Sequence, residues 1–238
     1  MLMARRREIR PLDERLLVNS VRILARAEPR FAAVLARHGP PPLWAREPGF
    51  ATLALLMLEQ QVSLAQARAM YARIELAAGR LTPQNIAKLG EAGLRAIGVT
   101  RQKSAYLAAL ARELDSGMLD LDALADMPDA AATAALDALH GVGPWTAHCY
   151  LLFALRRPDV FPAADLALTE AVRQLWNLRT RPSAQSLARR AAAWRPHRAA
   201  AARLLWHHYL SVRGIRLLDD AGIVLDDAGI FLDDARIV

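Results

Sequence analysis

Two aspartates lie in one short loop of the sequence, in different local settings. Asp165 directly precedes the apolar-periodic segment LALTEAVRQLW, so it is expected at a helix start, where the helix dipole keeps a carboxylate ionised. A charged carboxylate fixed there can stabilise developing positive charge or act as a general base. The alternative for Asp165 is a plain helix cap, worth on the order of 1 kcal/mol to stability. Asp159 follows Pro158 and is interpreted as a solvated turn residue.

A glycine-rich turn stands upstream of Asp165. The segment from Leu139 to Ala147 reads LHGVGPWTA between two apolar-periodic segments, which predicts a helix, a tight turn and a second helix. Gly141 and Gly143 leave backbone amides uncovered, and Pro144 suits the first turn of a helix. Uncovered amides at a helix start bind phosphate without reading a base. A lone Gly-x-Gly would indicate only an ordinary turn.

Other reactive side chains are scarce. Only Lys88 and Lys103 of the 31 basic residues are lysines, so amine nucleophiles are few. The single cysteine, Cys149, rules out an internal disulfide and a cysteine-ligated cluster, and is expected to be buried. His207 and His208 are adjacent and point in different directions on a helix, so no zinc-ligand spacing is present. No metal site is predicted.

Charge is unevenly distributed along the chain. The net charge is +7, but residues 218–238 carry six aspartates and one arginine, which leaves +12 on residues 1–217. Such a surplus suits nucleic acid, and equally a ribosomal or membrane-surface protein. The tail reads LDDAGIV, LDDAGIF, LDDARIV, a repeat too short for a supersecondary element. It is expected to be peripheral or disordered, with coiled-coil pairing as the disfavoured alternative.

Helix signals recur along the chain, and no run of alternating β-branched residues argues for a sheet, so the predicted fold is all-α. Ser63 opens a capping-box pattern before a helix expected over 64–78, and Thr82-Pro83 repeats the start signal. Further helices are expected over 183–194 and 197–212. No apolar run approaches the roughly 20 residues that span a bilayer, and the first residues lack the apolar core of a leader. A cytoplasmic protein with no membrane partner is expected.

The hairpin and the Asp165 loop together carry a family resemblance. LHGVGPWTA resembles the hairpin of the helix-hairpin-helix glycosylase superfamily, Leu-x-Gly-(Val/Ile)-Gly-x-x-Thr-Ala, and Val160 to Asp165 is similar to the loop that follows it. The resemblance implies a two-lobed helical fold with the active site in a cleft between the lobes, and it assigns the catalytic carboxylate to Asp165. Relatives that also nick the DNA backbone carry a lysine where this chain has Trp145. A monofunctional glycosylase, which flips a damaged base and hydrolyses its N-glycosidic bond, is therefore implied.

Further segments are similar to the alkylpurine branch, the 3-methyladenine DNA glycosylases of the inducible type. They are Glu59 to Ser63, Arg101 to Lys103, and the Gly-Pro-Trp of the hairpin. The similarity runs from about Phe50 to Arg213, and the chain before it is too short for the N-terminal β-rich domain of larger members. The predicted organisation is a helical segment packing on the core (1–49), a glycosylase core (50–217) and the acidic tail (218–238).

The resemblance also implies which residues contact DNA. Gln61 holds the place of the residue that fills the gap left by the flipped nucleotide, with a buried glutamine as the alternative. A cationic methylated purine favours an aromatic pocket through cation–π attraction. Trp145 is the leading pocket residue, and the others are Tyr150, Trp206, Tyr209, Trp44 and Phe50. The predicted DNA-binding residues are Gly141, Val142, Gly143, Thr146, Gln60, Gln61, Arg101 and Lys103.

The predicted partner is double-stranded DNA with damaged bases, bound by a monomer that uses no cofactor; the resemblance allows a monovalent cation at the hairpin carbonyls. Alternatives stay open. A non-catalytic helix-hairpin-helix DNA-binding protein would need no aspartate in the Asp165 loop. A glycosylase for a neutral lesion would protonate the leaving base, and usually brings an iron-sulfur cluster or a hairpin lysine. A helical protein unrelated to DNA would make the hairpin a coincidence. The sequence does not rank the alkylated bases.

Overall fold

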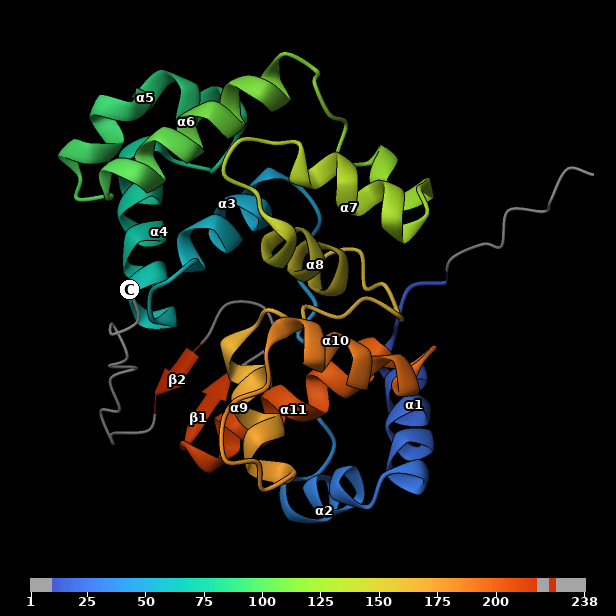
Figure 1. The fold of residues 1–238 in the computed structure, drawn as a ribbon. Helices are drawn as coiled ribbons and strands as arrows, with labels where there is room; N and C mark the ends of the chain where they lie inside the picture. Colours follow the sequence, from blue (N-terminus) through green and yellow to red (C-terminus); the bar gives the residue numbers. More distant parts are fainter. Residues whose placement is uncertain (1–9, 218–222, 226–238) are drawn as a thin grey trace, which may run out of the picture.

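The computed structural model describes residues 10–217 and 223–225, and within them helices build both halves of the molecule (Figure 1). The α-helices are α1 (Glu14–Ala27), α2 (Pro29–His38), α3 (Phe50–Glu59), α4 (Leu64–Ala78), α5 (Pro83–Ala96), α6 (Arg101–Asp115), α7 (Asp129–Asp137), α8 (Pro144–Phe153), α9 (Leu166–Leu175), α10 (Ala184–Ala191) and α11 (Arg198–Val212). Two short 3₁₀ helices are η1 (Ala123–Asp126) and η2 (Ala192–Trp194), and two short strands are β1 (Ile215–Leu217) and β2 (Ile223–Leu225).

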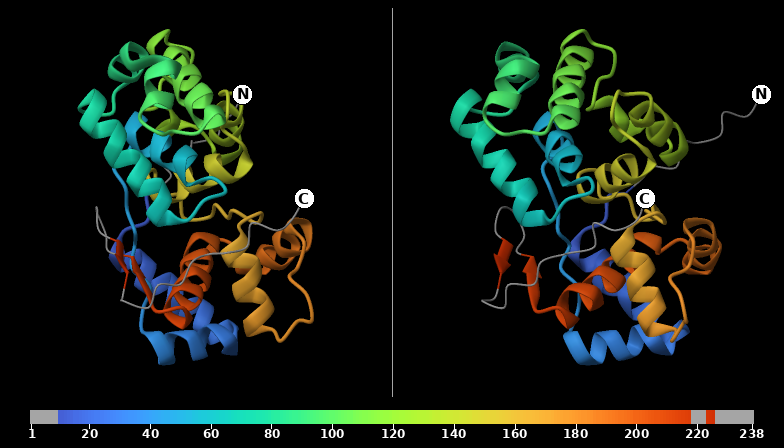
Figure 2. Two further views of the ribbon diagram at one scale, coloured as in Figure 1. Left: turned by 90° about the vertical axis from the view of Figure 1, so that its left-hand side faces the viewer. Right: turned by 60° about the vertical axis from the view of Figure 1, so that its left-hand side comes forward.

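The helices form two lobes, one above the other in Figure 1. The hairpin lobe consists of α3 to α8, and the terminal lobe consists of α1, α2 and α9 to α11. Both views of Figure 2 keep these two groups apart. The chain therefore starts in the terminal lobe, crosses to the hairpin lobe after α2, and returns after α8.

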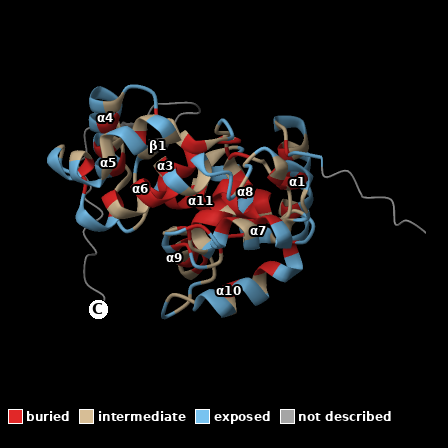
Figure 3. Ribbon diagram, turned by 90° about the horizontal axis from the view of Figure 1, so that it is seen from above, coloured by how far each residue is buried: buried red, intermediate tan, exposed pale blue. Residues whose placement is uncertain are grey.

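Each lobe encloses its own hydrophobic core. The hairpin-lobe core includes Leu53, Ile74 and Leu107, and the terminal-lobe core joins Phe31 from α2 to residues of α9 and α11. α11 is buried along most of its length and contacts α1, α2 and α9, as befits a helix that is apolar on most faces. Figure 3 shows buried residues gathered along α8 and α11, whereas α10 carries exposed residues at the periphery.

The capping signals read from the sequence are confirmed. The Ser63 hydroxyl accepts a hydrogen bond from the Gln66 backbone N–H, and the Gln66 side chain accepts one from Ser63 N–H, closing a capping box at the start of α4. α4 ends at Gly79, whose φ of 75° would be strained for a residue other than glycine. At the start of α5, the Thr82 hydroxyl accepts a hydrogen bond from the Asn85 backbone N–H.

The all-α prediction is confirmed, with one addition near the end of the chain. β1 and β2 pair antiparallel, with Arg216 opposite Val224. Otherwise the predicted tail, residues 218–238, lies outside the described residues. The domain boundaries at 49 and 217 stay predictions; α1 and α2 pack on α11, so the segment before residue 50 shares a core with the C-terminal helices. No helix in the described part of the chain is long and apolar enough to cross a membrane.

Candidate active site

Asp165 is the N-cap of α9, and both of its carboxylate oxygens accept hydrogen bonds. Oδ1 accepts from the backbone N–H of Leu168 at 2.9 Å and from the indole Nε1 of Trp206 at 3.0 Å. Oδ2 accepts from the indole Nε1 of Trp145 at 2.9 Å. The residue is only 9% exposed. Three donors thus fix the orientation of a single, nearly buried carboxylate.

The two indoles come from different lobes. Trp145 lies in the first turn of α8, directly after the glycine hairpin, and Trp206 lies in the middle of α11. Asp165 itself begins α9, which packs against α11 in the terminal lobe. The carboxylate therefore sits where the hairpin lobe meets the terminal lobe.

The protonation of Asp165 is set by opposing effects. Burial raises the pKa of its carboxyl, while the hydrogen bonds from Trp145, Leu168 and Trp206 act in the opposite direction because they favour the anion. The net direction is upward, because burial outweighs the hydrogen bonds to the carboxylate. A raised pKa in a buried carboxylate with specific polar partners is typical of a catalytic group.

Three of the predicted pocket residues are near this carboxylate. Trp145 and Trp206 bond to it, and the negative charge of Asp165 helps to raise the pKa of Tyr209, after the larger effect of burial. Tyr209 lies one turn beyond Trp206 on α11 and carries the guanidinium of Arg213 over its ring, 3.9 Å from the centroid. Trp145 from α8, and Trp206 and Tyr209 from α11, thus lie near the carboxylate.

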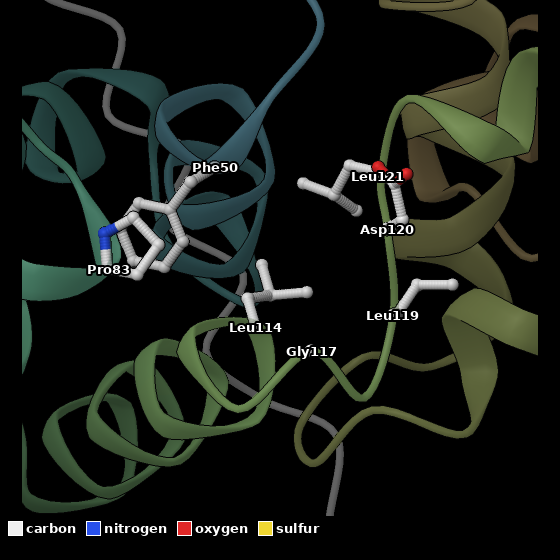
Figure 4. Close-up of a pocket in the computed structure, with 7 residues that line it drawn as sticks. All are labelled: Phe50, Pro83, Leu114, Gly117, Leu119, Asp120 and Leu121. Atoms are coloured by element: carbon white, nitrogen blue, oxygen red, sulfur yellow. The ribbon is translucent and has the colours of Figure 1, made fainter.

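The other three predicted pocket residues are placed elsewhere. Tyr150 is fully buried, and its hydroxyl accepts a hydrogen bond from the Gly49 backbone N–H at 2.9 Å. Phe50 lines a cavity of about 320 Å³ between the starts of α3 and α5 and the end of α6 (Figure 4). Trp44 is buried, with its ring 6.4 Å from that of His207. None of these contacts involves Asp165, so the place of the three residues in the base pocket stays a prediction; packing, which sequence spacing does not reveal, decides which way each ring faces.

The predicted hairpin is present between α7 and α8. Gly141 has φ 82°, and a Cβ there would lie 2.5 Å from the Tyr106 side chain, so only glycine fits. Gly143 is the N-cap of α8, and no side chain caps the helix, which leaves its first amides available to an anion. Val142 and Thr146 are buried, so their side chains help to hold the turn.

Gln60 and Gln61, at the end of α3, have different roles. Gln60 donates through Nε2 to the Gly141 carbonyl at 3.0 Å and to Thr146 Oγ1 at 2.8 Å, so it joins α3 to the hairpin. Gln61 is exposed and has φ 55°, a left-handed conformation unusual for a residue other than glycine. Its exposed side chain at a strained turn is consistent with the gap-filling prediction, whereas Gln60 is a structural residue.

Lys103 requires a correction. Its Nζ is buried and donates to the carbonyls of Met57, Leu58 and Gln60, at 3.1, 2.9 and 2.7 Å. Burial lowers the pKa of Lys103 to about 8, opposed by the charge of Glu59. The ammonium therefore caps the C-terminus of α3 and is not free to hold a phosphate, whereas Arg101, two residues earlier, is exposed.

Asp159 is also placed differently from its prediction. Its carboxylate accepts two hydrogen bonds from the Arg198 guanidinium, at 2.8 and 3.1 Å, so it anchors the loop to the start of α11. Cys149 is buried as predicted, and burial raises the pKa of its thiol well above the usual range. Within residues 10–217 and 223–225, no three histidine, cysteine or acidic side chains are grouped so that they could hold a metal ion.

Sequence reasoning missed a buried ion pair near the site. Arg46, in the crossing after α2, bonds both oxygens of Glu59 at 3.0 and 2.8 Å, and its backbone N–H donates to the Phe153 carbonyl. The sequence singled out Glu59 only as part of a motif. No sequence pattern pointed to Arg46, because its partner is thirteen residues away on a different element. Phe153, the last residue of α8, stacks on Trp206 with ring centroids 5.2 Å apart.

A two-lobed helical fold, a glycine hairpin opening a helix, and a buried aspartate at the junction together define a helix-hairpin-helix protein of base excision repair. A family model described as HhH-GPD superfamily base excision DNA repair protein matches residues 55–196. This chain belongs to that superfamily.

Curated relatives share this region of the chain. The DNA-3-methyladenine glycosylase of Bacillus subtilis (strain 168) is 32% identical over 123 residues, which cover 52% of this chain and 41% of the relative. DNA-3-methyladenine glycosylase 1 of Schizosaccharomyces pombe is 30% identical over 126 residues, which cover 52% of this chain and 55% of the relative. The chain spans less than two thirds of the length of such relatives, from 31% to 64% for the first three.

Solved structures show the same fold. That of Schizosaccharomyces pombe 3-methyladenine DNA glycosylase (Mag1) in complex with abasic DNA matches with a TM-score of 0.73 and 22% identity, covering 82% of this chain and 97% of that one. DNA-3-methyladenine glycosidase from Bacillus halodurans matches with a TM-score of 0.68 and 25% identity, covering 83% of this chain and 90% of that one.

Proposed function

We propose that this protein is a monofunctional DNA glycosylase that removes alkylated bases, of the 3-methyladenine and 7-methylguanine type, from duplex DNA. The observation that carries the proposal is the carboxylate of Asp165, nearly buried and held by the indoles of Trp145 and Trp206 at the junction of the lobes. The names of the curated relatives support the same substrate class.

The chemistry follows from the charge that develops when an N-glycosidic bond breaks. Positive charge builds on the sugar as the base departs, so a fixed anion beside the anomeric carbon stabilises the transition state and can activate water. Because the donors to Asp165 are already in place, little reorganisation is needed during the reaction. A base that is cationic through alkylation is a good leaving group and needs no separate general acid.

The absence of an available amine supports hydrolysis without strand cleavage. Trp145 stands where bifunctional relatives carry a lysine, and Lys103 is committed to capping α3. Lys88 is exposed on α5, and Figure 1 shows α5 at the outer side of the hairpin lobe. The product would therefore be an abasic site with an intact backbone.

DNA is the proposed partner, held by the uncapped amides at the start of α8 while Gln61 enters the duplex. We propose a monomer that acts in the cytoplasm and uses no cofactor. A monovalent cation at the hairpin would have to share the Gly141 carbonyl with Gln60, which already donates to it.

The test is base release from randomly methylated duplex DNA by the protein and its Asp165→Asn variant. The wild type is expected to release methylated purines that chromatography identifies, and the variant to lose at least about a thousandfold in single-turnover rate because the anion is gone. Affinity for the DNA should be retained, since the amides of the hairpin are unchanged.

Asp159→Asn is the matched control, because it removes a carboxylate from the same loop but breaks a contact to Arg198 instead. It is expected to lose stability while keeping base release. DNA binding without base release by the wild type would favour the non-catalytic alternative. Base release undiminished in Asp165→Asn would reject the assignment of the carboxylate.

A further inference from the structure

The orientation of the Trp206 indole is a requirement of the site, since its N–H is one of three donors to Asp165. An indole turns about two side-chain torsions, so the position of its N–H depends on what packs against the ring. The contact that fixes the ring comes from Phe153 at the end of α8. The two rings stack with centroids 5.2 Å apart and an interplanar angle of 27°.

Phe153 belongs to both halves of the molecule. It is half-buried, and its side chain packs against the core of the hairpin lobe as well as that of the terminal lobe. Trp206, by contrast, belongs to the terminal lobe alone. A donor in one lobe is thus held by a ring that the other lobe supplies.

Phe153 is itself restrained by two guanidinium groups. The Arg46 Cζ lies 5.3 Å from the ring centroid and the Arg203 Cζ lies 5.8 Å from it, both within the range of cation–π attraction. Arg46 is held by its ion pair with Glu59, and fully buried Arg203 donates to the Leu43, Ala199 and Leu152 carbonyls. The ring therefore has fixed neighbours on several elements.

We propose that Phe153 is a positioning residue for base release: it holds the Trp206 indole so that its N–H points at Asp165. This inference rests on the proposed glycosylase function. Phe153 contributes no donor or acceptor of its own, and its effect on the reaction passes through Trp206. Loss of the stacked ring would leave the indole free to turn and would weaken the hydrogen bond that favours the ionised carboxylate.

The test compares Phe153→Leu, Phe153→Tyr, Trp206→Phe and the double variant Phe153→Leu/Trp206→Phe. Single-turnover base release is measured against pH, together with affinity for DNA. Phe153→Leu is expected to shift the acidic limb of the pH–rate profile to higher pH by about one unit. At pH values below that limb, base release should then be about tenfold slower than in the wild type. Phe153→Tyr keeps a ring that can stack and should restore most of the rate. In the Trp206→Phe background, Phe153→Leu should add little, because the donor it positions is already absent.

A second readout needs no enzymatic activity. The ¹H–¹⁵N resonance of the Trp206 indole is followed by NMR in the free protein across pH. It should titrate with Asp165 in the wild type and lose that dependence, or titrate at higher pH, in Phe153→Leu. A wild type that releases no base would end the proposed function, while the indole titration would still decide whether Phe153 positions the donor.

Phe31→Leu is the matched control, because Phe31 packs on Trp176 and Trp194 in the terminal-lobe core and is not stacked on Trp206. It should lower thermal stability without moving the acidic limb or the Trp206 resonance. Additive effects of Phe153→Leu and Trp206→Phe, or an unchanged Trp206 titration in Phe153→Leu, would overturn the proposal. An equal shift of the limb in Phe31→Leu would overturn it as well.

Discussion

The carboxylate of Asp165 accepts three hydrogen bonds and is almost completely shielded from solvent. Burial raises its pKa, and each N–H donor offsets part of that rise. In the proposed reaction the ionised form of Asp165 stabilises the transition state, so activity should increase with pH as the carboxyl loses its proton. Removing a donor must move that increase to higher pH.

Trp206→Phe removes one donor and keeps an aromatic ring. A hydrogen bond to a charged group contributes about 1.5 to 3 kcal/mol, so the acidic limb of base release should move up by about one to two pH units. Single-turnover rates across pH measure the shift. Trp194→Phe, a similar change in the same lobe, should leave the limb in place, and equal shifts in both variants would mean that general loosening is responsible.

At the scale of the elements, the end of α3 makes more contacts with other elements than its sequence suggests. The Lys103 ammonium donates hydrogen bonds to three carbonyls there, and Gln60 joins the same turn to the hairpin through a hydrogen bond. The exposed Gln61 follows directly, in a left-handed conformation. The position of Gln61, the proposed gap-filling residue, thus depends on a lysine from α6.

Lys103→Met tests that dependence. The variant keeps the apolar stem but loses the cap, so the free energy of unfolding should fall by about 2 kcal/mol and base release should slow. The salt dependence of DNA affinity should stay unchanged, because this ammonium is not expected to contact phosphate. Lys88→Met, at an exposed position on α5, is the control and should alter neither stability nor rate. A flatter salt dependence in Lys103→Met would restore the original prediction that Lys103 binds DNA.

Helix boundaries that are set by local capping residues were predictable. Ser63, Thr82 and Gly79 act within one turn of their position, so α4 begins and ends, and α5 begins, where the sequence indicates. Asp165 and the hairpin were found because their spacing is local too. The roles of Lys103, Tyr150 and Phe153 were not predictable, because each depends on a partner from a distant element.

At the scale of the molecule, the packing of α2 on α11 brings three histidines together. The ring of His38 lies 6.0 Å from that of His207 and 5.6 Å from that of His208. Burial lowers the pKa of His208 to about 4, and neighbouring positive charges act in the same direction. The pKa of His208 in the folded protein is below the unfolded value of 6.5. Neutral His208 therefore contributes to the stability of the folded protein above pH 6.5, and this contribution is lost as the pH falls toward 4.

His208→Asn should remove part of this sensitivity to acid. Between about pH 7 and about pH 4.5, the wild type is expected to lose about 2 kcal/mol more unfolding free energy than the variant. Urea unfolding at the two pH values measures the difference. His140→Asn, at an exposed site in the hairpin lobe, should behave like the wild type, and an equal loss in all three proteins would exclude the histidine cluster as the cause.

The two crossings between the lobes also govern the order of assembly during synthesis. The hairpin lobe is one continuous stretch of chain and can close its core as soon as α8 has emerged. α1 and α2 are made before the hairpin lobe, yet the helix they pack on, α11, is made after it. α1 and α2 therefore emerge from the ribosome before α11 can cover their apolar faces, and the carboxylate of Asp165 acquires its second indole only after α11 has been made.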